Sequence, residues 1–416
     1  MLTEVTVEVL ENILSNESED LDYNVLATAK DGCLYFIPDN SRRISKFDPV
    51  TKSVKEIGND LGCKPGSWHG GVMNTYDGCT YFVPSSARHI LKYDPLMEVA
   101  SFVGENLGDE EYKWAGGVQA KDGCIYCTPD CADKILKYDP IADKSTFVGN
   151  GIGLKPFRFS GEVLGYDGNI YYVPSCAKQV LKYNPSDDTA NFIGDEYTGI
   201  GKWYGGVLAP DGFIYCNPSS SKRYLRIDIM NQSTSLVGPT LDLTDEGVLG
   251  RDGCIYISSH DCIIKFDPRT NQDTKIPMTE NVKRGKYYGG AVAHDGCIYA
   301  MDYSNPRRLL KLTVPPPKQV LITPHFRTSL LTKISFEHSR DFGSDPFNCI
   351  LKYFEKLDGG FVNEFDNYGK KFLPYILQYA NEKDENSKVN VLFEILRNDP
   401  SLVTIMSTSL MKKALR

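Results

Sequence analysis

Carboxylates stand at two places where most copies of a recurring Gly-Gly motif have glycine. These carboxylates are Glu162 and the pair Asp245-Glu246. If the strands that carry the motif line a central channel, the carboxylates and His69 point into it and could hold a metal ion for hydrolysis. A hard cation takes about six oxygen ligands, and the other copies of the motif offer only glycine. We therefore expect no catalytic residues, no metal and no cofactor.

An aromatic residue precedes the same Gly-Gly position in five copies of the motif. These residues, which include all three tryptophans of the chain, are Trp68, Trp114, Phe159, Trp203 and Tyr287. On one face of a ring-shaped fold they would form an aromatic collar that stacks on a ligand or a peptide. The alternative is that each ring packs between neighbouring repeats and serves the fold alone.

Basic residues recur in the loop after the second strand of six of the seven repeats. They are Arg42 and Arg43, Arg88, Lys134, Lys178, Lys222 and Arg223, and Arg307 and Arg308. The whole chain is acidic, with a net charge of −8. A basic ring on an acidic chain favours docking of an acidic peptide, a phosphate or an acidic tail. Scattered surface charge is the alternative.

A basic residue also recurs at one place in the third strand. The residues are Lys46, Lys92, Lys137, Lys182, Arg226, Lys265 and Lys311. They could line a surface. We expect instead that each stem packs between neighbouring repeats and that the charged head pairs with a nearby carboxylate.

The dipeptide Asp-Gly occurs seven times at a spacing of about 45 residues, with its aspartates at Asp31, Asp77, Asp122, Asp167, Asp211, Asp252 and Asp295. Around the third copy we read four strands, in Gly116–Lys121, Cys124–Pro129, Ile135–Tyr138 and Thr146–Gly149. Asp-Gly suits a type I′ hairpin turn, and the Asp-Pro after the third strand suits a type I turn. Four short antiparallel strands in about 45 residues make one propeller blade. We therefore predict an all-β, seven-bladed β-propeller of four-stranded blades over residues 22–323.

The phrases Gly117-Val118, Gly123-Cys-Ile-Tyr126 and Tyr138-Asp-Pro140 resemble the kelch class of propeller repeats. The resemblance covers about three quarters of the chain. It implies a propeller and, by analogy, a binding role. Kelch repeats carry a Gly-Gly pair after the second strand. Here that place holds Pro38, Pro84, Pro129, Pro174 and Pro218.

Closure of the ring has two alternatives. A fourth strand for the seventh blade could come from Gln319–Ile322, after the prolines at 315–317. Alternatively, Glu4–Leu10 in the N-terminal segment 1–21 could supply a strand that latches the ring. The same segment also reads as a helix, so the sequence leaves the choice open.

The chain after residue 323 has a different character. We read 324–345 as a linker and 346–416 as a small α-helical unit. Asp366-Asn-Tyr-Gly369 and Phe372-Leu-Pro374 resemble the turn and first helix of a degenerate ankyrin repeat. Since one or two such repeats rarely stand alone, we expect this unit to pack on the propeller or on a partner.

Five cysteines share one slot of the repeat, directly after Asp-Gly: Cys33, Cys79, Cys124, Cys254 and Cys297. One such slot per blade places these thiols too far apart for disulfides, which need Cα atoms within about 7 Å. Buried reduced thiols indicate a reducing, cytoplasmic location. Cys124 and Cys127 have the spacing of zinc ligands. We do not expect them to bind metal, because their side chains face opposite sides of one strand.

The sequence pI of about 5.4 argues against a nucleic-acid partner, and no apolar run is long enough for membrane insertion. We predict a non-catalytic protein-interaction or scaffolding propeller, a component of a large assembly such as the cytoskeleton, that holds an acidic or extended protein partner. The alternatives are a metal-dependent, lactonase-like hydrolase with a channel site, and a substrate adaptor of a ubiquitin ligase.

Overall fold

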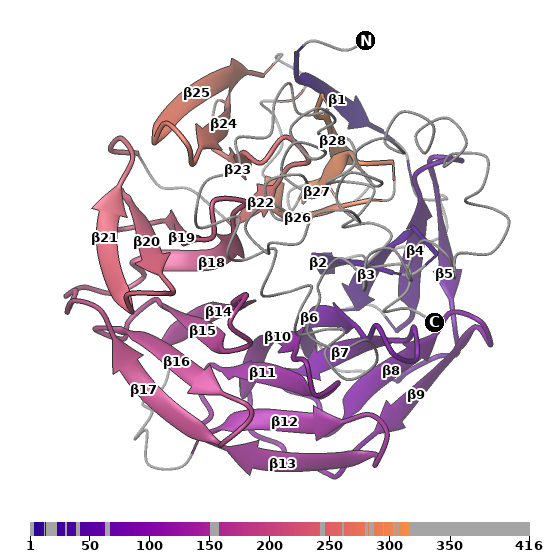
Figure 1. Ribbon diagram of the computed structural model, residues 1–416. Coiled ribbons are helices and arrows are strands. Elements are labelled where there is room, and N and C mark those ends of the chain that lie inside the picture. The colour runs from indigo at the N-terminus through magenta and orange to yellow at the C-terminus, as the bar shows by residue number, and fades with distance from the viewer. Residues whose placement is uncertain are drawn as a thin grey trace, which may run out of the picture. The chain divides into compact units, whose positions relative to one another are not determined.

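The computed structural model describes residues 4–11, 13, 23–29, 31–38, 42–62, 67–149, 158–241, 246–259, 262–278, 282, 287–293, 295–302, 305 and 308–315. The strands form seven antiparallel sheets of four strands each, arranged as the blades of a ring (Figure 1). The prediction of an all-β, seven-bladed propeller is thereby confirmed. The predicted linker 324–345 and the predicted ankyrin-like helical unit 346–416 lie outside the described residues.

Each blade runs from an inner first strand to an outer fourth strand, and blades 1 to 6 are contiguous in sequence. Blade 1 contains β2 (Tyr23–Thr28), β3 (Leu34–Pro38), β4 (Ile44–Asp48) and β5 (Ser53–Ile57); blade 2 contains β6 (Trp68–Met73), β7 (Thr80–Pro84), β8 (Ile90–Asp94) and β9 (Val99–Val103); blade 3 contains β10 (Trp114–Gln119), β11 (Ile125–Pro129), β12 (Ile135–Asp139) and β13 (Lys144–Val148). Blade 4 contains β14 (Phe159–Leu164), β15 (Ile170–Pro174), β16 (Val180–Asn184) and β17 (Thr189–Ile193); blade 5 contains β18 (Trp203–Leu208), β19 (Ile214–Pro218), β20 (Tyr224–Asp228) and β21 (Ser233–Val237); blade 6 contains β22 (Gly247–Leu249), β23 (Ile255–Ser258), β24 (Cys262–Asp267) and β25 (Gln272–Pro277).

Blade 7 is built from both ends of the propeller. It contains β26 (Tyr287–Val292), β27 (Ile298–Asp302) and β28 (Leu309–Thr313), and its outer strand is β1 (Thr6–Leu10) from the N-terminus. Strand β1 pairs antiparallel with β28 along its whole length, and the two lie side by side in Figure 1. The N-terminal latch is therefore the alternative that the structure shows. Its hydrogen bonds join the two ends of the repeat array and so close the ring.

The Asp-Gly turn ties the second and third strands of its blade together. In blade 3, Asp122 Oδ1 accepts a hydrogen bond from the Cys124 N–H (3.1 Å), and Oδ2 accepts one from the Tyr126 hydroxyl (2.8 Å). Lys137 on β12 lies with Nζ 3.0 Å from the same Oδ2. The same lysine–aspartate pair recurs in five other blades, as Lys46–Asp31, Lys92–Asp77, Lys182–Asp167, Lys265–Asp252 and Lys311–Asp295. The expected pairing of this lysine with a carboxylate is confirmed in these six blades.

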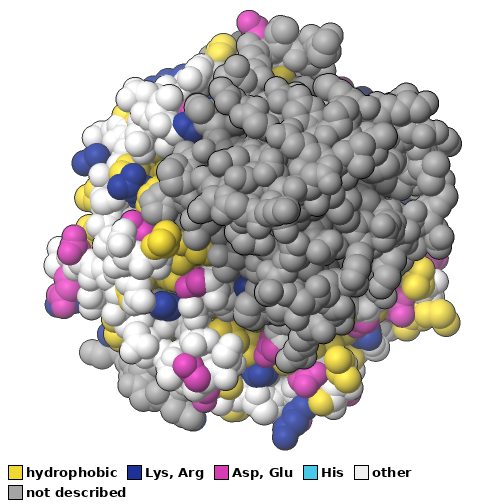
Figure 2. Space-filling view, in the orientation of Figure 1, with side chains coloured by type: hydrophobic (Ala, Val, Ile, Leu, Met, Phe, Trp, Pro, Cys, Tyr) yellow, Lys and Arg dark blue, Asp and Glu magenta, His cyan; other side chains and the backbone are white. Residues whose placement is uncertain are grey.

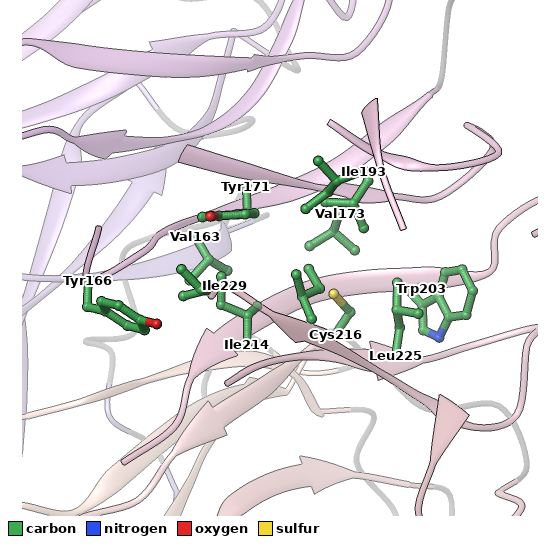
Figure 3. Close-up of a cluster of buried hydrophobic side chains, with 12 residues drawn as sticks. Val163, Tyr166, Tyr171, Val173, Ile193, Trp203, Ile214, Cys216, Leu225 and Ile229 are labelled. Atoms are coloured by element: carbon green, nitrogen blue, oxygen red, sulfur yellow. The ribbon is translucent and has the colours of Figure 1, made fainter. Parts of the chain in front are cut away.

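The core lies between blades. Figure 3 shows one such layer, where Val163 and Tyr171 of blade 4 face Trp203, Ile214 and Cys216 at the start of blade 5. Every residue of the second strand in this pair of blades is buried, which explains why that strand is apolar almost throughout. Because each blade covers the face of the next, one blade cannot fold alone.

Candidate functional site

The first strand of every blade lies at the centre of the ring, next to the first strands of its neighbours (Figure 1). In β10 a β-bulge shifts the register with β11 between Trp114 and Gly117, and Gly116 within it has a φ of +85°. The corresponding residues of four other blades are also glycines with positive φ: Gly70, Gly161, Gly205 and Gly289. These positions form what we call the inner ring.

The inner ring is tight because the backbones of adjacent blades meet there. A methyl group on Gly70 would lie 2.6 Å from Cα of Gly116, and one on Gly161 would lie 2.8 Å from Cα of Gly205. Only glycine permits such an approach. In blade 6 the corresponding residue is Glu246, which brings a carboxyl group to a place where five other blades have no side chain.

Glu162 on β14 follows the inner ring of blade 4 and reaches across to blade 3. Its Oε2 accepts a hydrogen bond from the Thr128 hydroxyl, and its carboxyl group also accepts one from the Gly117 N–H. A methyl group on Gly116 would lie 2.9 Å from Oε2, so glycine is needed to admit the carboxyl group. Two blades therefore fix the orientation of one carboxyl.

The surroundings of Glu162 hold its proton more tightly than usual. Burial raises the pKa of Glu162 to about 8; the hydrogen bond from Thr128 opposes this rise, while the negative charge of Glu246 adds to it. The residue as a whole is half-buried, but protein atoms surround its carboxyl group densely enough to disfavour the charged form. A carboxyl group with this pKa can donate and accept a proton near neutral pH, as general acid–base catalysis requires.

Tyr172 adds a hydroxyl to the same place. It lies directly opposite Glu162 in the register of β14 and β15. Its side chain is fully buried, and its hydroxyl has no hydrogen-bond partner among the described residues. Burial, and then the charge of Glu162, raise the pKa of Tyr172 well above its usual value. Tyr172 is therefore a neutral O–H group on the residue that faces Glu162 in the neighbouring strand.

Glu246 has its own polar neighbour, Asn217 at the end of the second strand of blade 5. A methyl group on Gly205 would lie 3.2 Å from Glu246 Cγ and 3.5 Å from Asn217 Nδ2, so both side chains flank that glycine. A methyl group on Gly247 would lie 2.5 Å from Asn217 Oδ1. The amide of Asn217 is fully buried, and neither of its polar atoms has a partner among the described residues.

Our sequence analysis missed Thr128, Tyr172 and Asn217, although two of them leave a signal. Thr128 and Asn217 stand directly before the proline of the second strand, where blades 2 and 4 have Val83 and Val173. Polar residues in such a buried strand are unusual. Both precede the two blades that carry a glutamate at the channel.

His69 does not join these carboxyl groups in a metal site. It is near Asp130 of blade 3: burial raises the pKa of Asp130, and the charge of His69 lowers it. Within the described ranges, no three His, Cys, Asp or Glu side chains lie close enough to hold a metal ion. Asp245, the remaining member of the predicted set, lies outside those ranges. The donor set of a metal-dependent hydrolase is therefore not assembled in the described part of the channel.

The aromatic collar is buried. Trp68, Trp114, Phe159, Trp203 and Tyr287 have exposed fractions of only 1% to 3%. The indole Nε1 of each tryptophan donates a hydrogen bond to a backbone carbonyl, of His89, Lys134 and Arg223 in turn. The rings pack between blades and offer no face to a partner, which corrects their assignment as partner-binding residues.

The basic ring is paired with acidic residues. Arg42, Arg88 and Lys178 form ion pairs with Asp60, Asp109 and Glu196 on the loops that leave the fourth strands, with Arg42 Nη2 2.7 Å from Asp60 and Lys178 Nζ 3.0 Å from Glu196. Figure 2 shows basic and acidic side chains interspersed along the visible rim rather than a basic patch. Among the described residues, the side chains of Lys134 and Lys222 form no ion pair, and Arg307 lies outside the described residues. Docking of an acidic partner on these cations stays a prediction.

The cysteines behave as small apolar groups. The ten within the described residues are all free thiols, seven of them buried. Burial raises the pKa of Cys79 and of Cys124 to about 12. These thiols are therefore protonated and unreactive at neutral pH. As a separate matter, no helix in the described part of the chain has the length and apolar character needed to cross a membrane.

Comparison with known proteins finds relatives by fold alone. No protein-family model matches the chain, and no curated protein is similar to it. Virginiamycin B lyase from Staphylococcus aureus superposes with a TM-score of 0.63 and 14% identity, over 75% of this chain and 100% of that chain. A streptogramin B lyase gives 0.61 and 15%, over 74% and 98%. The extracellular domain of a hybrid two-component system from B. thetaiotaomicron gives 0.59 and 13%, over 76% and 44%.

These comparisons correct two predictions. The similar structures are lyase and sensor propellers rather than kelch proteins, so the resemblance to kelch repeats extends to the propeller fold and no further. The prediction that the chain is not an enzyme is contradicted, because virginiamycin B lyase, which is similar in fold, is an enzyme. The propeller fold hosts both catalysis and sensing. The site must therefore decide between them.

Proposed function

We propose that the chain is a propeller enzyme that acts on a small polar substrate in its central channel, with Glu162 as the residue that takes up and returns a proton. The observation that carries this proposal is the raised pKa of Glu162, about 8, in a carboxyl group that Thr128 and Gly117 hold in one orientation. A proton carrier works best when its pKa lies near the working pH.

The polar groups around Glu162 support a defined chemical role. Tyr172 offers an O–H that no described residue uses, and it can donate to an oxygen on which negative charge develops. A base beside such a donor suits an elimination reaction, in which a proton leaves carbon while a bond to a leaving group breaks. Two of the similar structures are lyases by name, which agrees with this reaction class.

The test compares wild type with Glu162→Gln and with Glu111→Gln, a control at an exposed position. Each protein is incubated with a panel of small lactones, esters and primary amines, and products are followed by mass spectrometry from pH 6 to pH 9. We expect turnover that rises as Glu162 ionises and that falls about 100-fold or more in Glu162→Gln. Glu111→Gln should match wild type. Equal turnover by Glu162→Gln and wild type would refute the assignment.

A second readout needs no substrate. Infrared difference spectra report the C=O stretch of a protonated carboxyl group, which disappears on ionisation. Wild type should show one such band that is lost near pH 8, and Glu162→Gln should lack it. A band that titrates near pH 4.5 instead would remove the main support for the proposal.

A further inference from the structure

Asn217 and Glu246 make a second polar site in the channel, apart from the Thr128–Glu162 pair. Asn217 comes from blade 5, and Glu246 takes the inner-ring place of blade 6. Gly205 lies between them. A methyl group placed on it would lie 3.2 Å from Glu246 Cγ and 3.5 Å from Asn217 Nδ2. A methyl group placed on Gly289 of blade 7 would lie 3.8 Å from Glu246 Oε2. Its carboxyl group therefore spans from blade 5 toward blade 7.

The amide of Asn217 is free to bind a ligand. A fully buried amide without hydrogen bonds destabilises the fold, and such groups are rare in folded proteins. Both polar atoms of Asn217 are in this state, beside a carboxyl group with which they make no hydrogen bond. A bound group that donates hydrogen bonds to Asn217 Oδ1 and to the Glu246 carboxylate together would remove the part of this destabilisation that falls on Oδ1.

The charge of the channel wall selects the sign of that group. The first strands and inner-ring positions of the seven blades carry Glu162 and Glu246 but no lysine or arginine. Clefts that carry one sign of charge concentrate ligands of the opposite sign. A divalent metal is disfavoured because it takes six or more oxygen ligands, and no cluster of three acidic, His or Cys side chains occurs within the described ranges. A primary ammonium group has three N–H donors, which one amide oxygen and one carboxylate can accept.

We infer that Asn217 and Glu246 bind the ammonium group of an organic amine, so that the substrate class of the proposed enzyme is a small primary amine. This inference rests on the proposed function for its catalytic meaning, but binding can be measured without catalysis. The amine would be held by Glu246 from blade 6 while Glu162 on blade 4 exchanges the proton.

The test uses propylammonium chloride as the probe, with sodium propionate and calcium chloride as comparison ligands. Binding to the full chain is measured by saturation-transfer NMR for the organic ions and by calorimetry for all three. We expect saturable millimolar binding of propylammonium, weakened at least about tenfold by Glu246→Gln. Asn217→Leu should weaken it as well, and Glu111→Gln should leave it unchanged. Circular dichroism checks that each variant is folded.

Each outcome supports or overturns the inference. Absence of saturable propylammonium binding to the wild type overturns it, as does equal affinity in Glu246→Gln. Tighter binding of calcium, lost in Glu246→Gln, would make the site a metal site instead. Should Asn217→Leu fail to fold, Glu246→Gln still decides the question. Failure here leaves the Glu162 proposal intact, because that proposal is scored by turnover and by the ionisation of Glu162.

Discussion

The Thr128 hydroxyl of blade 3 donates a hydrogen bond to the carboxyl group of Glu162 in blade 4. This contact joins two blades at the channel, and it links the packing of the propeller to the chemistry of the candidate site. In blades 2 and 4 the place of Thr128 holds a valine that packs against glycine of the next blade, with Val83 Cγ2 3.1 Å from a methyl group placed on Gly117. The polar pair therefore replaces an apolar contact.

Thr128→Val should raise the pKa of Glu162 further, because it removes the hydrogen bond that favours the ionised form. The variant should also lose about 1 kcal/mol of stability, since the carboxyl group then keeps only the hydrogen bond from the Gly117 N–H. Carboxyl infrared titration and urea unfolding measure the two effects. Thr128→Ser keeps the hydroxyl and should restore both values. An unchanged midpoint in Thr128→Val would show that the hydrogen bond does not control Glu162.

The raised pKa of Glu162 predicts how stability depends on pH. Between the usual value of 4.5 and the folded value of about 8, the folded state binds a proton that the unfolded state has released. Glu162 therefore makes the protein lose stability as pH rises through this window. Glu162→Gln has no such proton, so its stability relative to wild type should increase from pH 5 to pH 8. Urea unfolding at both pH values measures the difference in the free energy of unfolding between the variant and wild type. A difference that stays constant with pH would contradict the raised pKa of Glu162.

Acid should loosen the Asp-Gly turns. Burial alone would raise the pKa of Asp122, but hydrogen bonds from Lys137, Tyr126 and the Cys124 N–H outweigh it and lower the pKa. The stability that the ionised carboxylate contributes is present above the unfolded pKa of 3.8 and is lost as pH falls through the lower folded value. Asp122→Asn should therefore destabilise the protein by about 1–3 kcal/mol at pH 7 and by less at pH 3.

Lys137→Met provides the contrast at the same turn. The ion pair is partly exposed, so its loss should cost about 1 kcal/mol or less, because Tyr126 and the Cys124 N–H still hold Asp122. Urea unfolding of both variants at pH 7 and pH 3 tests the pair of expectations. If Lys137→Met lost more free energy of unfolding than Asp122→Asn, the carboxylate of Asp122 would not be the group that stabilises the turn most.

The N-terminal latch should control closure of the ring. Val7 and Val9 on β1 are half-buried and pack against the core of blade 7, whereas Glu8 between them is exposed. Val9→Asp should lower the melting temperature by several degrees, because it buries a charge without a partner. Glu8→Gln is the matched control and should stay close to wild type. Equal melting temperatures for Val9→Asp and wild type would show that β1 is dispensable.

The repeat was readable from the sequence because its signals are local. Asp-Gly turns, prolines at strand ends and the apolar run of Ile125–Pro129 each reflect the conformation of a few adjacent residues, and seven regular copies leave one architecture. The pairing of Lys137 with a carboxylate followed from the same regularity. The sequence could not decide whether Glu4–Leu10 or Gln319–Ile322 supplies the last strand, because each segment is an acceptable strand by itself.

The candidate site depended on the tertiary structure. Glu162, Thr128 and Gly117 are brought together only when blade 4 packs on blade 3, and no spacing along the chain reports that contact. Sequence shows residue type and period but not burial or pairing, so neither the burial of the aromatic residues nor the ion pairs of the basic residues could be predicted. Packing between blades buries Trp114, and a loop 21 residues further along pairs Arg88. The sequence determined the ring and its period, whereas contacts between blades determined which polar groups face the channel.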